Sequence, residues 1–160
     1  MEKLEGFSDA TRIWIYQSNR ILQASEIKEI NTILVNFNKE WATHGSKMKT
    51  ACFVVEPCFI FMAVDQSAIE ASGCSIDSSV KVLKEIESKF NIDLFDRLNL
   101  TYVDSQGQIQ MIKMGDFQEG LKAGIFTEET IVFNNLIDSI RDLESNWKTT
   151  VSKSWHKNLV

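Results

Sequence analysis

The chain has 160 residues, of which 44% are hydrophobic and 24% charged, with a single proline. This composition is typical of globular proteins, and a chain of this length buries about 70% of its unfolded surface around one core. The 17 basic and 22 acidic residues give a net charge of −5. Because the lysines and arginines form no cluster, we expect neither nucleic acid nor a membrane surface as partner.

The first twelve residues are acidic and lack the apolar stretch of a secretory signal. The longest apolar run, 58–64, is too short to cross a bilayer, so we expect a cytoplasmic protein. Three cysteines are an odd number, which predicts free thiols in a chain that needs no disulfides. With two histidines and neither CxxC nor HxxxH spacing, we expect no metal site and no cofactor.

The predicted elements begin with a strand at 12–17, a segment that alternates in character and carries β-branched and aromatic side chains. A helix follows, from a cap at Ser25 to a stop at Gly45, with apolar residues at helical spacing. The segments 50–55 and 58–64 are apolar on both alternations. They predict two antiparallel strands covered on both faces, joined by a tight turn at the proline.

The second half of the chain continues with a helix that begins near Ser75 or Asp77 and ends at Asn91. A hairpin is predicted next, with strands at 98–103 and 108–113 around a polar turn that contains glycine. Both elements follow from local side-chain periodicity.

The C-terminal third is less regular. Asp116 and Glu119 have the spacing of a capping box for a short helix that ends at Gly124. A strand at 130–133 and a helix over 136–147 complete the series. Strands joined by hairpins favour an α+β fold over a doubly wound parallel sheet.

We therefore expect one domain over residues 1–160, with helices packed on a mostly antiparallel or mixed sheet. Residues 1–10 and 157–160 are expected to be frayed, because they continue no periodic element.

The most distinctive segment is 71–79, where small polar residues gather at a helix start. Unpaired amides and the helix dipole attract anions there and lower the pKa of an exposed thiol. The segment therefore predicts a small-anion site at Cys74, Ser75 and Asp77, with Cys74 as a reactive thiol. The alternative is that Ser75 and Asp77 only cap the helix while Cys74 is a buried filler.

A thiol enzyme also needs a base, and the sequence offers only His44 and His156. Neither is close to Cys74 along the chain. His44 falls at a helix C-terminus, where a capping role suits it, and His156 follows Trp155 in the tail.

No phosphate-binding loop is present in the sequence. The nearest approach to a P-loop, 115–122, has its lysine one place too late and lacks the following Ser or Thr, and no GxGxxG occurs. Other polar side chains follow the predicted strands, and would line one ligand-binding edge if those strand ends converge. The alternative for them is ordinary turn and cap chemistry. They are Gln17, Ser18, Asn19, Arg20, Asp65, Asn134 and Asn135.

The segments WIYQSNR, ASGCSIDSSV, LFDR and VFNN, with the closing LESNW and SWH, resemble a family of short uncharacterised proteins of Bacteroidetes-type bacteria. Such proteins often carry the label ABC transporter ATPase. This chain lacks the Walker motifs that the label requires, so the resemblance implies no ATPase activity. It directs attention to the motif positions Arg20, Cys74, Ser75, Asp77, Asn134 and His156.

The sequence thus favours a non-enzymatic protein that binds a small anion or a protein partner. Two alternatives stay open. One is a small thiol-dependent or hydrolytic enzyme with Cys74 as nucleophile, and the other is a structural subunit of a homo-oligomer.

Overall fold

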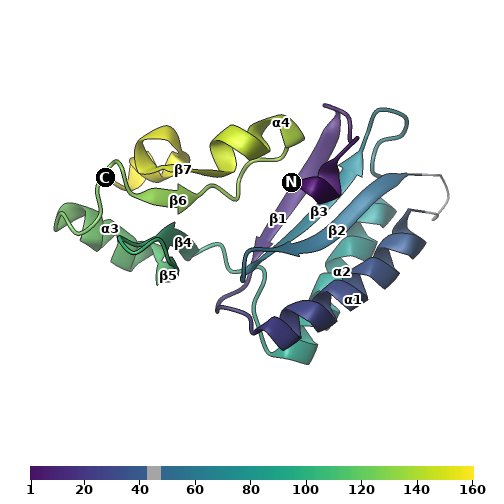
Figure 1. Ribbon diagram of the computed structural model, residues 1–160, viewed down its shortest axis with the longest axis horizontal. Helices are drawn as coiled ribbons and strands as arrows, with labels where there is room; N and C mark the ends of the chain where they lie inside the picture. The colour runs from purple at the N-terminus through teal and green to yellow at the C-terminus, as the bar shows by residue number, and fades with distance from the viewer. Residues whose placement is uncertain (43–47) are drawn as a thin grey trace. The chain divides into compact units, whose positions relative to one another are not determined.

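The computed structural model describes residues 1–42 and 48–160, which form two compact units (Figure 1). The first unit comprises Met1–Phe95 with Asp138–Ile140, and the second comprises Asp96–Ile137 with Arg141–Val160. Each unit contains its own antiparallel sheet, so the predicted α+β class is confirmed. The extent of a single domain over 1–160 stays a prediction.

The first unit is built on a three-stranded sheet in the order β1-β3-β2. Its strands are β1 (Thr11–Gln17), β2 (Lys49–Val55) and β3 (Phe59–Asp65). All seven residues of β3 are buried, and the first six are apolar on both alternations, as expected for a central strand. The turn into β3 has Glu56 at φ 51 followed by Pro57.

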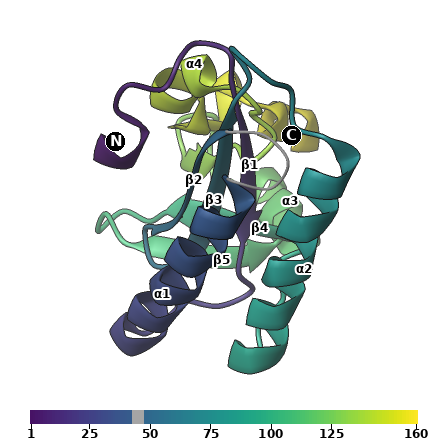
Figure 2. The same ribbon diagram turned by 90° about the vertical axis from the view of Figure 1, so that its right-hand side faces the viewer.

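Two helices, α1 (Ala24–Trp41) and α2 (Gly73–Phe90), lie side by side on one face of this sheet (Figure 2). They pack on it through an apolar cluster that includes Leu34, Ile60 and Leu83. Where α1 ends, the indole Nε1 of Trp41 donates to the carbonyl of Ser75 (3.0 Å), at the start of α2. The two helices are therefore antiparallel.

Both helix starts differ from the predicted ones. The cap of α1 is Gln23, whose side chain forms a capping box with Glu26, and Ser25 lies inside the helix. The cap of α2 is Ser72, whose Oγ accepts from the Ser75 amide (3.2 Å). The real cap of α1 stands two residues before Ser25, and that of α2 stands three before Ser75 and five before Asp77, because the periodic apolar stripe begins about one turn after the helix itself does. The predicted stop of α1, Gly45, lies outside the described residues.

Side chains of α1 bond the outer edge of β2. Asn38 Nδ2 donates to the carbonyl of Thr50 (3.2 Å), and Asn31 Oδ1 accepts from the amide of Val54 (3.0 Å). Free backbone groups on an edge strand otherwise recruit further strands. The two asparagines occupy two of the groups that an added strand would use.

The second unit holds a four-stranded sheet in the order β5-β4-β6-β7. Its strands are β4 (Asn99–Val103), β5 (Ile109–Lys113), β6 (Ile131–Phe133) and β7 (Lys148–Thr150), and α3 spans Met114–Lys122. The strands and α3 share a core of Leu100, Phe117, Val132 and Val151.

The C-terminal third departs most from its prediction. In place of a helix over 136–147 there is a short turn, α4 (Ile140–Asp142), and a π-helical stretch over Leu143–Trp147, followed by the unpredicted β7. Leu136 is 62% exposed and starts no helix. The cap of α3 is Lys113 without a side-chain bond, so the Asp116–Glu119 capping box is wrong.

Short 3-10 turns at Glu2–Leu4, Val151–Lys153 and Trp155–Leu159 complete the chain. At the N-terminus, Leu4 is buried, and Ser8 donates through its amide and its hydroxyl to the carboxylate of Asp65 (2.8 and 2.6 Å).

Candidate functional site

The start of α2 is an exposed helix terminus with one of its amides already bonded. The Ser75 amide bonds Ser72 Oγ, and the Ser75 side chain is buried, 3.0 Å from the same oxygen. Asp77 and Cys74 are exposed. The cap is Ser72, so neither Ser75 nor Asp77 is the capping residue that the alternative predicted, and Cys74 is not a buried filler. The small-anion site at Cys74, Ser75 and Asp77 stays a prediction.

The three cysteines are free, and they differ in exposure. Cys74 is exposed, whereas Cys52 and Cys58 are buried. Burial raises the pKa of the Cys58 thiol to about 12 and also raises the pKa of Cys52, because it disfavours the thiolate. Cys74 is therefore the accessible thiol of the chain.

Arg20 is held by an ion pair and a backbone contact. Its guanidinium donates to both carboxylate oxygens of Glu26 (2.7 and 2.8 Å) and to the carbonyl of Phe90 (2.8 Å). The Arg20 hydrogen bonds, with the Gln23 amide, lower the pKa of Glu26 to about 2. Phe90 ends α2, 16 residues after Cys74, which is about 24 Å at 1.5 Å per residue. Arg20 and Cys74 therefore share no site.

The polar ends of the first unit's strands do not converge. Gln17 pairs with Phe59 at one end of the β1–β3 ladder, while Asp65 pairs with Thr11 at the other. Antiparallel pairing thus separates the two ends by the full length of the strands, about 20 Å. Asn19 serves a turn, since its Oδ1 accepts from the amide of Asp93 (3.0 Å).

In the second unit, Asn134 has turn contacts. Its Oδ1 accepts from the amide of Leu136 (3.3 Å), and its own amide donates to the carbonyl of Trp147 (2.6 Å). The bond to the Leu136 amide is that of an Asx turn, the alternative that the sequence left open.

His156 is fully buried. Ser154 Oγ contacts its Nδ1 at 2.8 Å, the Trp155 ring stacks on it at 4.0 Å, and Phe117 lies edge-on at 6.2 Å. Desolvation lowers the pKa of His156 to about 4, so the ring is neutral at pH 7. Its Nε2 has no hydrogen-bond partner within the described part of the chain. The other predicted base, His44, lies outside the described residues.

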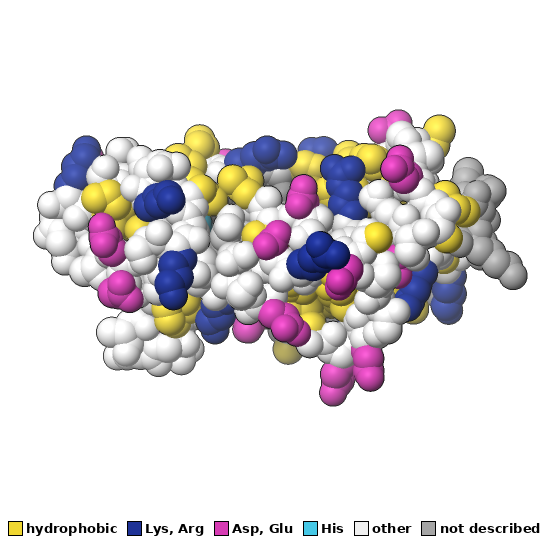
Figure 3. All heavy atoms as spheres, turned by 90° about the horizontal axis from the view of Figure 1, so that it is seen from above, with side chains coloured by type: hydrophobic (Ala, Val, Ile, Leu, Met, Phe, Trp, Pro, Cys, Tyr) yellow, Lys and Arg dark blue, Asp and Glu magenta, His cyan; other side chains and the backbone are white. Residues whose placement is uncertain are grey.

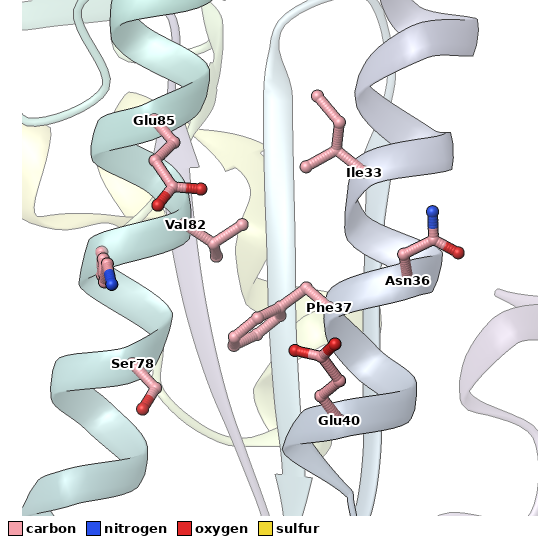
Figure 4. A pocket seen from close by; sticks show the side chains of 8 residues that line it. Ile33, Asn36, Phe37, Glu40, Ser78, Val82 and Glu85 are labelled. Carbon is pink, nitrogen blue, oxygen red and sulfur yellow. The ribbon is translucent and has the colours of Figure 1, made fainter.

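A surface groove between α1 and α2 was not predicted from the sequence. It has a volume of about 360 Å³, and its apolar lining consists of Ile33, Phe37 and Val82 (Figure 4). Val82 is buried, whereas Ile33 and Phe37 are only half-buried, and Figure 4 shows the Phe37 ring between the two helices. The helical periodicity of α1 places both residues at the edge of its apolar stripe. That position was the one sequence signal from which the groove could have been predicted.

The rim of the groove is polar and carries both signs of charge. Asn36 and Glu40 lie on the α1 side, and Lys81 and Glu85 on the α2 side, all four with exposed side chains. Within residues 1–42 and 48–160, Lys81 and Glu85 make no ion pair. Farther along the helices, Lys89 and Glu29 form a bridge across the pair (2.5 Å).

Cationic and anionic side chains are intermixed across the face seen in Figure 3, without a basic patch. Within the described ranges, no group of three His, Cys, Asp or Glu side chains could hold a metal ion. None of the helices described is both long and apolar enough to cross a membrane.

No protein-family model, curated protein or solved structure matches this chain. The resemblance to the Bacteroidetes-type family therefore stays a prediction.

Proposed function

We propose that this protein acts by binding, and that the groove between α1 and α2 receives a helical segment of a partner protein. The observation that carries the proposal is the open groove of about 360 Å³, with half-buried Ile33 and Phe37 on its apolar lining and exposed polar groups on its rim. An apolar centre within a polar rim is the usual composition of a protein interface.

A helix suits this groove better than an extended peptide. The backbone groups of α1 and α2 are bonded within each helix, so they offer a strand nothing to pair with. A third helix needs no such bonds, since its side-chain ridges pack into the groove at an interaxial distance of about 8–10 Å. A small anion is disfavoured in the groove because the carboxylates on its rim, Glu40 and Glu85, outnumber its one ammonium, Lys81.

The test is NMR titration of the protein with an uncharged helical peptide that carries leucines along one face and glutamines elsewhere. We expect saturable shifts of the Ile33, Phe37 and Val82 amides. Asn36→Trp, which fills the groove, should abolish them, whereas Val35→Trp, at an exposed position on α1 that does not line the groove, should leave them unchanged. Shifts elsewhere, or shifts that survive Asn36→Trp, would contradict the proposal.

Thiol chemistry at Cys74 is a second candidate function, favoured by the exposure of that cysteine alone of the three. It is the weaker one. His156 is buried and belongs to the other compact unit, and the described residues provide no other histidine.

A further inference from the structure

The α2 wall of the groove carries two charged side chains that have no ion-pair partner among the described residues. Lys81 and Glu85 are exposed and four residues apart, so they lie on the same side of α2, about 6 Å from each other along its axis (Figure 4). Glu40, on the α1 wall, already has an interaction of its own. The charges that this rim leaves for a partner are therefore the cation and the anion of α2.

The order of these two residues along α2 accounts for the absence of a bridge between them. In a helix, a glutamate four residues before a lysine forms the better ion pair, and the reverse order is less favourable. In α2 the lysine comes first. Lys81 and Glu85 thus stand in solvent beside the apolar lining of the groove, where each can pair with an opposite charge on another chain.

We infer that the partner helix runs antiparallel to α2 and carries a lysine four residues before a glutamate, with its apolar face toward Ile33, Phe37 and Val82. This inference rests on the proposed function of the same groove. In this alignment the lysine of the partner is level with Glu85 and its glutamate is level with Lys81, because four residues span the same length in both helices. Both charges of the α2 wall are then paired.

The direction of the partner follows from the same rule that leaves Lys81 and Glu85 apart. A helix parallel to α2 would need its glutamate before its lysine, which is the order in which the two pair within their own helix. Such a helix would lose its internal pair on binding. A helix antiparallel to α2 has the less favourable order, so its charges are available to α2. Complementary charges across an interface fix its register and suppress wrong arrangements.

The experiment is NMR of the isotope-labelled protein with a helical peptide that has lysine and glutamate in this order, leucines along the groove face and glutamines elsewhere. A nitroxide amino acid four residues before the lysine would be level with Lys89 (85 + 4), and one four residues after the glutamate would be level with Asp77 (81 − 4). We expect each nitroxide to broaden the amides at its own end of α2. The preference for this direction should be about 4- to 25-fold at low ionic strength, which is about 2- to 5-fold for each of the two ion pairs.

Exchange of the two charges on the protein completes the test. In Lys81→Glu/Glu85→Lys the same peptide should bind in the opposite direction, so the two nitroxides should exchange the ends of α2 that they broaden. Glu129→Lys/Lys157→Glu makes the same exchange between exposed residues of the second unit that do not line the groove, and it should leave the pattern unchanged. If the groove amides shift but the broadening is the same with and without the exchange in α2, the charge inference is overturned and the groove function stands. If the peptide shifts no groove amide, both are overturned.

Discussion

The buried imidazole of His156 makes the stability of the protein depend on pH. Its pKa in the folded protein is about 4, against an ordinary value of 6.5. Below pH 6.5 the unfolded chain therefore takes up a proton that the folded protein does not. Stability from this group is present above pH 6.5 and is lost as the pH falls toward 4. Linkage between the two pKa values predicts a loss of about 2 kcal/mol in the free energy of unfolding between pH 7 and pH 5.

The structural cause of this loss is the surroundings of the ring. The His156 ring lies against Trp155 and Phe117, and its Nε2 has no acceptor among the described residues, so a second ring proton would be buried without a hydrogen bond. Glu26 and Asp65 contribute little to the change of unfolding free energy between pH 7 and pH 5. Their pKa values are lowered in the folded protein from ordinary values that are already below 5, so both carboxylates stay largely ionised in this range.

The assay is urea unfolding at half-unit steps from pH 7 to pH 5, for the native protein and for His156→Gln. The variant is less stable at pH 7, because it loses ring packing, but its free energy of unfolding should vary with pH by about 2 kcal/mol less than that of the native protein. Parallel curves for the two proteins over this range would refute the reasoning.

Two further predictions concern single side chains. Cys74 should react with iodoacetamide at pH 8 while the two buried cysteines stay unmodified until the protein unfolds, as mass spectrometry of peptides would reveal; equal labelling of all three would contradict their burial. Gly120→Ala should lower the free energy of unfolding by about 1–3 kcal/mol, because its Cβ would lie 2.4 Å from the Phe126 ring. Gly115→Ala on the same helix meets no atom within 4 Å and should raise that free energy by about 0.5–1 kcal/mol, so a similar loss from both substitutions would refute the steric argument.

The sequence predicted most elements because their signals are local. The buried strand β3 is apolar on both alternations, and the stop of α2 at Asn91 follows from the left-handed conformation that Asn91 adopts there, at φ 49. The helix that periodicity predicted over 136–147 does not form, since Leu136 is exposed and Leu143–Trp147 is a π-helical stretch. An i, i+4 pattern reports which residues share a helix face, but not whether a helix forms.

The candidate site residues likewise divide into those whose environment follows from local sequence and those whose contacts come from distant segments. Cys74 is exposed at the start of α2, as its prediction as an accessible thiol required and as the buried-filler alternative did not. The contacts of Arg20 with Glu26 and Phe90 could not be predicted, because Phe90 is 70 residues away along the chain. A strand end and a helix end meet only once the core has packed.

By itself, the sequence determined the helices and strands of the first unit, the hairpin of the second and the α+β class, since each depends on side-chain spacing within a few residues. Tertiary structure alone decided that the ends of β1 and β3 lie apart, that His156 is buried and that a groove opens beside Phe37. The physical reason is that strand direction, burial and the spacing of two helices arise from contacts between distant segments, and periodicity along one segment does not encode them.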